Sequence, residues 1–198
     1  TPASLPAGLA RQVQAWEQFL NGDSLKQQLM SRYLYEHLFL GHLVFEGDTK
    51  FSAFRLIRSS AAPGTPAQPL ATRRPYDDPG VPRVHYRLVP ERETVLAKTH
   101  MPYLLSPTRM AKFRSWFLDA DYRVDAMPSY AVELASNPFV TFAAIPPDSR
   151  YRFLLDEAEF FSPFGLRSLS RFHREHPLVV PLPDGEVRLD YEPAESPC

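Results

Sequence analysis

The segment Ser31–His42, with the sequence SRYLYEHLFLGH, places two tyrosines, a glutamate and two histidines inside a strongly apolar stretch. Buried polar groups need hydrogen-bond partners, because each orphaned group costs on the order of 1–3 kcal/mol. A helix of this composition is therefore unusual for a purely structural element. We expect the rest of the chain, or a ligand, to supply partners for these side chains.

Two amphipathic helices are predicted at the N-terminus. In Gly8–Leu20 the apolar residues recur at helical spacing, and an Asn-Gly pair ends the pattern. Ser24 followed by Gln27 is a capping-box signature, which predicts a second helix that runs to about His42. We expect the two helices to pack together as a helical hairpin.

The remaining sequence mixes strand and helix patterns, so the predicted fold class is α+β, with the N-terminal helical hairpin packed on a small antiparallel sheet and further helices. Strands are expected at Phe51–Ser59, His85–Val89 and Thr94–Ala97, the last two paired around a turn at Pro90–Glu93. Helices are expected from Ser106 to about Ala120, at Ser129–Ser136 and at Tyr151–Phe161, whereas Phe139–Ile145 is apolar and favours a strand. The character of the sequence changes after Phe161, which predicts a domain over residues 1–161 and an atypical C-terminal tail over residues 162–198.

Bulk properties exclude several classes of site and partner. The formal net charge is −1, so no global field attracts the protein to nucleic acid. Cys198 is the single cysteine, which excludes an internal disulfide, a Cys-rich metal site and a Cys-x-x-Cys-His haem attachment within this sequence. No run approaches the roughly 20 apolar residues of a membrane-spanning helix, and no signal peptide is visible.

The histidines raise the question of a metal. His37 and His42 are five residues apart, so on a continuous helix they diverge by about 140° and cannot chelate one ion as an i, i+4 pair does. His42 could still act as a single ligand, with help from His100 or Met101, because haem iron accepts His and Met axially. The alternative is that these histidines are structural.

Two charged segments also have alternative interpretations. In Thr72–Gly80, Arg73 or Arg74 could clamp a phosphate or carboxylate. The alternative is an ion-pair cluster that ties down a long loop. The acidic residues of 156–159 are interpreted as a solvated helix face.

Several blocks of the sequence together resemble the bacterial fatty acid cis/trans isomerases. The blocks are YLYEHLFLGH, TRRPYDDPG, AKTHMPY, SNPF and RYRFLLDEAEF, and they occur in the family's order over roughly Tyr33–Phe161. The resemblance implies a periplasmic haem enzyme that converts cis-unsaturated acyl chains of membrane phospholipids to trans chains in place, without hydrolysis, as part of membrane stress adaptation. It implies no nucleic-acid partner.

The mechanism proposed for that family has oxidised haem iron withdraw electron density from the alkene, which lets the weakened bond rotate before the electron returns. The resemblance places the reaction centre near Tyr33 and near the residues expected to be catalytic, which are Tyr35, Glu36, His37, His42 and His100. The residues expected to contact the c-type haem, its propionates or the lipid head group are His42, His100, Met101, Arg73 and Arg74.

The sequence departs from the family pattern in two ways. The Cys-x-x-Cys-His motif is absent, and the resemblance stops after Phe161. We therefore expect this chain to be an incomplete part of a larger enzyme. The rival hypotheses are a non-catalytic lipid- or partner-binding module that lost the haem, and a metal-dependent hydrolase that uses Glu36, His37 and His42.

Overall fold

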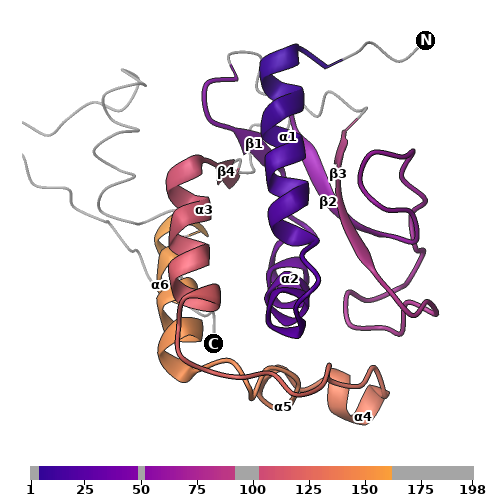
Figure 1. The fold of residues 1–198 in the computed structure, drawn as a ribbon, viewed down its shortest axis with the longest axis vertical. Helices are drawn as coiled ribbons and strands as arrows, with labels where there is room; N and C mark the ends of the chain where they lie inside the picture. The colour runs from indigo at the N-terminus through magenta and orange to yellow at the C-terminus, as the bar shows by residue number, and fades with distance from the viewer. Residues whose placement is uncertain (1–4, 49–51, 92–102, 162–198) are drawn as a thin grey trace, which may run out of the picture. The chain divides into compact units, whose positions relative to one another are not determined.

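A computed structural model describes residues 5–48, 52–91 and 103–161 of the chain (Figure 1). Residues 1–157 form one compact unit, and the contacts reported below lie within the described part of it. The predicted boundary between residues 161 and 162 stays a prediction, because residues 162–198 lie outside the described ranges.

The described chain is α+β, as its sequence predicts. Its helices are α1 (Ala7–Leu20), α2 (Leu25–Leu38), α3 (Pro107–Phe113), the π-helical turn η1 (Arg114–Leu118), α4 (Val132–Ala135), α5 (Pro138–Thr141) and α6 (Pro147–Phe161). Its strands are β1 (Leu43–Phe45), β2 (Phe54–Ser59), β3 (His85–Pro90) and β4 (Tyr103–Leu105).

The four described strands form a mixed sheet in the order β3-β2-β1-β4. β2 pairs antiparallel with β1 and β3, whereas β4 runs parallel to β1. The sequence predicts an antiparallel sheet, and the parallel β1–β4 pair departs from that prediction. The reason is that β1 and β4 are apolar triplets, too short to show the alternation by which strands are recognised in a sequence. The expected strand Thr94–Ala97 lies outside the described residues, and the partner that β3 has within them is β2.

The N-terminal helix pair is confirmed. Figure 1 shows α1 along the vertical and α2 closer to end-on below it, so the two helices cross. The side chain of Asn21, at the end of α1, holds this pair to the sheet. Its amide donates to the carbonyl of Tyr86 at 2.7 Å, and its carbonyl oxygen accepts from the Tyr86 amide at 2.8 Å.

Helix α2 begins where the capping signature predicts and ends earlier than expected. Ser24 Oγ accepts a hydrogen bond from the Gln27 amide at 3.2 Å. The helix ends at Leu38 rather than near His42, because the His42 carbonyl accepts from the Tyr103 amide of β4 at 2.8 Å. Residues at the end of the helical sequence pattern therefore pair with the sheet instead of extending the helix.

Replacing Ser24 with alanine should lower the free energy of unfolding by about 1 kcal/mol, because the α2 amide that it caps loses its acceptor. Urea unfolding of the full chain measures the change. Ser24→Asn should keep most of the stability, since asparagine caps equally well. Equal losses in both variants would show that the cap is not what the serine contributes.

Residues 139–145 do not form the expected strand. Pro138–Thr141 is instead helix α5, and the Asn137 side chain accepts from the Phe139 amide at 3.0 Å. Asn-Pro reads in sequence as a break, yet here it serves as the N-cap and first turn of a helix. The local capping geometry outweighs the β-leaning composition.

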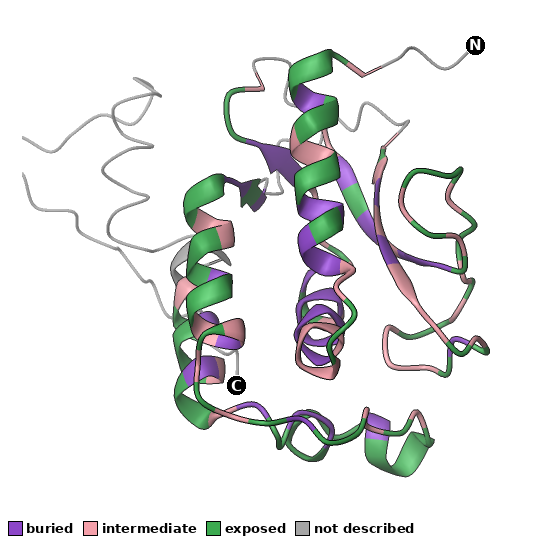
Figure 2. Cartoon of the chain, viewed as in Figure 1, coloured by how far each residue is buried: buried purple, intermediate pink, exposed green. Residues whose placement is uncertain are grey.

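An aromatic cluster joins α2 to the C-terminal helices. The Tyr33 ring lies 4.9 Å from Phe142, 5.2 Å from Phe153 and 5.4 Å from Phe117, measured between ring centroids. Figure 2 shows α2 as the most thoroughly buried helix of the unit. The helix singled out in the sequence is therefore the centre of the core.

Candidate functional site

A buried salt bridge marks the polar side of α2. Arg32 Nε donates to Glu36 Oε1 at 2.8 Å, one helical turn away, and Arg32 is only 1% exposed. Its Nη1 donates to the carbonyl of Pro128 at 2.8 Å, and its guanidinium lies 3.8 Å from the centroid of the Tyr130 ring. Arg32 therefore links α2 to the segment that leads into α4.

A second buried arginine comes from the sheet. Arg58 on β2 is 2% exposed, and its Nη1 donates to the carbonyl of Asp77 at 2.8 Å. Its Nη2 donates to the Thr72 hydroxyl, and its guanidinium lies 5.3 Å from the centroid of the Tyr35 ring. The Tyr35 ring in turn lies 5.6 Å from that of Tyr86 on β3.

We call these side chains the Arg/Tyr cluster. Its members share burial, or contact with a buried guanidinium, and they come from α2, β2, β3 and the segment before α4: Arg32, Tyr35, Glu36, Arg58, Tyr86 and Tyr130.

The Arg/Tyr cluster contains more hydrogen-bond donors than acceptors, because its two phenols stay protonated beside two guanidiniums and one carboxyl group. Burial raises the pKa of Glu36, and the hydrogen bond and charge of Arg32 oppose that rise. Burial also raises the pKa values of Tyr35 and Tyr86, so both phenols keep their protons. Two guanidiniums thus face one carboxylate, and Arg32 Nη2 and Arg58 Nε have no hydrogen-bond partner within the described residues.

Of the five residues expected to be catalytic, Tyr35 and Glu36 belong to the Arg/Tyr cluster. His37 lies elsewhere: its Nδ1–H donates to the Tyr33 carbonyl at 2.7 Å, and its ring packs 5.3 Å from that of Phe153. This desolvating contact lowers the pKa of His37, so the ring is neutral at pH 7. The structure therefore divides the cluster expected around α2 between two faces of the helix.

His42 lies beyond the end of α2, next to β1. Its Nδ1–H donates to Glu91 Oε2 at 2.6 Å, and Arg55 Nε lies 3.5 Å from the other oxygen of that carboxylate. His100 and Met101, expected to act with His42, lie outside the described residues. What the structure describes at His42 is a hydrogen bond to a glutamate at the end of the sheet.

Arg73 and Arg74 are both exposed and do not enter the Arg/Tyr cluster. The Arg74 backbone amide donates to the Asp77 carboxylate at 2.8 Å, and its guanidinium lies 5.7 Å from the Tyr76 ring. The arginine that holds this loop is Arg58, from the neighbouring strand.

Asp156 and Glu157 of α6 are largely shielded from solvent, contrary to the interpretation of this helix face from its sequence. Glu157 is buried and accepts a hydrogen bond from the Tyr103 hydroxyl. Asp156 pairs with Lys112, and Arg109 Nη1 lies 3.6 Å from Glu157 and 3.7 Å from Asp156. Burial raises the pKa of Glu157 to about 7. We call these five side chains the Tyr103–Glu157 cluster.

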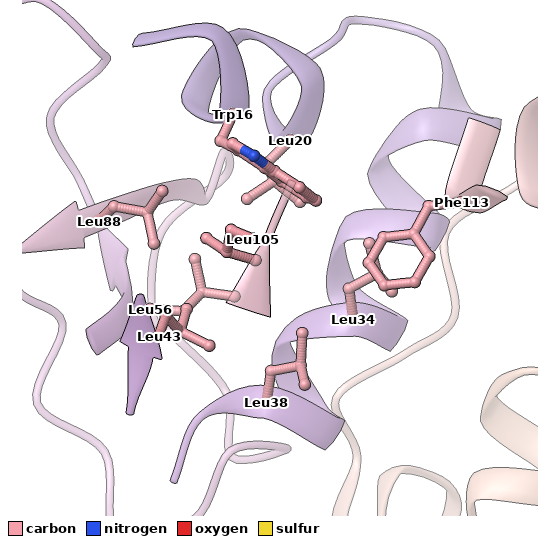
Figure 3. A pocket seen from close by; sticks show the side chains of 9 residues that line it. All are labelled: Trp16, Leu20, Leu34, Leu38, Leu43, Leu56, Leu88, Leu105 and Phe113. Atoms are coloured by element: carbon pink, nitrogen blue, oxygen red, sulfur yellow. The ribbon is translucent and has the colours of Figure 1, made fainter. Parts of the chain in front are cut away.

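The pocket in Figure 3 does not provide an acyl-chain slot. It is a void of about 10 Å³ between α1, α2, α3 and the sheet, about the minimum volume that holds one water. Its lining is wholly apolar: Trp16, Leu20, Leu34, Leu38, Leu43, Leu56, Leu88, Leu105 and Phe113. It is a packing gap in the core and could not admit a haem or a lipid chain without rearrangement.

The described side chains also form no cluster that would bind a metal ion. Glu36, His37 and His42 each have a different partner, so the hydrolase hypothesis has no common site. Within the described ranges, no group of three or more His, Cys, Asp or Glu side chains could hold a metal ion.

Sequence reasoning missed the burial of Arg32, Arg58 and Glu157. The Arg32–Glu36 pair carried a usable signal, because an arginine and a glutamate four residues apart lie on one helix face. Arg58 carried none, since arginine on a strand is ordinarily exposed. Glu157 was hidden by its acidic neighbours, which made the whole face look solvated.

Comparison with known proteins identifies the class of this domain. The model of the family described as fatty acid cis/trans isomerase matches residues 1–164. The chain therefore belongs to the fatty acid cis/trans isomerase family, as its sequence blocks indicate.

A protein of Saccharomyces cerevisiae named uncharacterized protein YMR196W is 49% identical over 43 residues, which are 22% of this chain and 4% of the yeast protein. No solved structure matches the chain. None of the described helices is long and apolar enough to cross a bilayer.

Proposed function

We propose that the whole protein converts cis-unsaturated acyl chains of membrane phospholipids to trans chains in place, using a haem in the periplasm. The observation that carries this proposal is the match of residues 1–164 to the fatty acid cis/trans isomerase family. The α+β unit would be the lipid-facing part of that enzyme.

We also propose where the haem and catalytic residues lie. The void between α1, α2, α3 and the sheet is far too small for a haem, so we place the haem against residues outside the described ranges. His42, His100 and Met101 remain our choice for contacts to it, because the Tyr103 amide that follows the latter pair in sequence donates to the His42 carbonyl. Arg73 and Arg74 are exposed and thus available to a head group or propionate.

Tyr35, Glu36 and His37 are proposed to act less directly than His42 and His100. Tyr35 and Glu36 are held by the two buried arginines, and His37 is packed on Tyr33. These contacts suit side chains that fix the shape of α2 rather than side chains that exchange protons with a substrate.

The full-length protein should form trans acyl chains when it is mixed with vesicles of cis-monounsaturated phosphatidylcholine. Gas chromatography of the fatty acid methyl esters measures the cis and trans fractions. We expect the total of unsaturated chains to stay constant, with no release of free fatty acid. Release of free fatty acid would indicate hydrolysis, and the absence of trans chains would contradict the proposal.

A second candidate is a non-catalytic lipid- or partner-binding module. The observation that favours it is the small apolar void of about 10 Å³ between α1, α2, α3 and the sheet, which is too small for an acyl chain. Vesicle binding without any trans-chain formation by the full-length protein would support this candidate over the isomerase.

A further inference from the structure

Helices α4 and α5 present large apolar side chains to solvent. Phe139 is 78% exposed, which is unusual for a phenylalanine on an ordered helix. We define the α4–α5 patch by its exposed hydrophobic members, which are Val132, Leu134, Phe139 and Val140. Figure 2 shows both helices as largely exposed. Neighbouring exposed apolar groups of this kind mark interaction sites.

The patch is held in place from within. The Thr141 hydroxyl donates to the Leu134 carbonyl at 3.0 Å and thereby closes α5 onto α4. On the inner side Ala135 and Phe142 are buried, and the Phe142 ring lies 4.9 Å from that of Tyr33. The segment is therefore apolar on both its inner and its outer side, which is typical of an element that is covered on both.

The Arg/Tyr cluster anchors the segment that leads into the patch. Arg32 binds the Pro128 carbonyl and lies against Tyr130, immediately before α4. Because Arg32 is itself buried and paired with Glu36, this anchor belongs to the core. The exposed side chains thus project from a fixed base.

The charge of the segment indicates what covers it. Glu133 is the single charged residue between Ala126 and Pro147, in a chain of which 23% of residues are charged. A surface without cations gains nothing from anionic lipid, and a surface with one carboxylate offers little to a charged protein partner. The segment is complementary to a surface with no net charge, because burying the segment against such a surface removes few charged groups from water.

We propose that the α4–α5 patch docks on zwitterionic phospholipid membrane, with Phe139 and Val140 inserted at the interface between head groups and acyl chains. The proposal rests on the proposed function, for which it names the surface that meets the lipid. Short apolar elements bind this interface by the area that they bury in it.

The test is co-sedimentation of the full-length protein with phosphatidylcholine vesicles. The double variant Phe139→Ser, Val140→Ser should bind at least roughly tenfold more weakly, because two apolar side chains leave the interface. Leu40→Ser is the matched control, since Leu40 is 70% exposed but lies in a different part of the chain, after α2. It should bind like the wild type, and all three proteins should share one unfolding midpoint.

Salt and lipid charge separate this proposal from electrostatic attachment. The ratio between the vesicle affinities of the wild type and the double variant should be unchanged between low and physiological salt and when phosphatidylglycerol is added, because the patch carries no cation. Equal binding by the double variant, binding that requires anionic lipid, or no binding by the wild type would each overturn the proposal. A double variant that loses self-association but still binds vesicles would assign the patch to a second copy of the chain.

Turnover distinguishes failure of docking from failure of the proposed function. The double variant should lose trans-chain formation on vesicles and keep it on detergent-dispersed cis fatty acid. A wild type that binds vesicles through the patch but forms no trans chains on either substrate would contradict the isomerase and leave docking supported. If the double variant binds vesicles and forms trans chains on them as well as the wild type does, docking through the patch is contradicted and the isomerase is supported.

Discussion

Replacing Arg32 with methionine should lower the free energy of unfolding by about 3–5 kcal/mol, which is the usual cost of removing one partner of a buried ion pair. The variant leaves Glu36 without the cation that donates to it and the Pro128 carbonyl without its donor. Urea unfolding at pH 8 measures the loss. The loss should be smaller at pH 5, because Glu36 already has a raised pKa and is protonated more readily once Arg32 is gone.

The chain contains a matched control for this prediction. Arg152 and Asp148 on α6 form the same i, i+4 arrangement at 2.9 Å, but both side chains are more than half exposed. Arg152→Met should change the free energy of unfolding by no more than about 0.5 kcal/mol. If the two variants lose equal stability, the burial of Arg32 is not what makes its pair important.

A double substitution tests whether charge or shape matters at Arg32. Replacing Arg32 with methionine and Glu36 with leucine together removes both charges and keeps much of the apolar volume. We expect it to recover at least about 1 kcal/mol relative to Arg32→Met alone, since no buried carboxylate is left unpaired. No recovery would indicate that the link to Pro128 carries most of the effect.

Local sequence signals predicted helices α1, α2 and α3 and where α2 and α3 begin, although they failed at α5 and at the end of α2. The Ser24 cap, the Ser-Pro start of α3 and the helical spacing of α1 each depend on neighbouring residues, and each is confirmed. The β1–β4 pair could not be predicted, because its parallel register depends on residues about sixty positions apart. That same pairing ended α2 early and moved His42 off the helix.

The candidate site shows the same division between local and distant contacts. Tyr35 and Glu36 were recognised as polar residues in need of partners, and the structure supplies those partners. The identity of the partners was not readable, because Arg58 reaches Tyr35 from another element, and Tyr130 reaches Arg32 from nearly a hundred residues away.

Two of the family's sequence blocks meet in the Tyr103–Glu157 cluster. AKTHMPY ends at Tyr103, and RYRFLLDEAEF contains Asp156 and Glu157. Their contact is a hydrogen bond between a buried phenol and a buried carboxyl group, flanked by Arg109. Part of what makes these blocks recognisable is therefore explained by folding, and the contact gives the chain a pH-dependent element.

The stability of the domain should fall as pH rises from about 5 to 8, and Glu157 should account for much of the fall. Burial, opposed by the Tyr103 hydrogen bond and by Arg109, raises the pKa of Glu157 from 4.5 to about 7. Below pH 4.5 the carboxyl is protonated in both the folded and the unfolded chain. Between pH 4.5 and about pH 7 the unfolded chain releases the proton and the folded chain retains it, so rising pH favours unfolding.

The loss from this one group amounts to roughly 3 kcal/mol, since each pKa unit corresponds to about 1.4 kcal/mol. Urea unfolding of the wild type and of Glu157→Gln at several pH values between 4 and 8 measures it. Glutamine keeps an acceptor for the Tyr103 hydroxyl and cannot ionise, so the variant should lose this part of the pH dependence.

Glu133→Gln, which removes an exposed carboxylate from α4, should leave the wild-type pH dependence intact. The quantity to compare is the stability of Glu157→Gln minus that of the wild type, which should grow with pH between 4.5 and 7 and then level off. A difference that stays flat across this range would show that Glu157 is ionised in the folded protein throughout. Arg109 would then outweigh burial at this site, and the carboxylate would stabilise the fold as the charged partner of that cation.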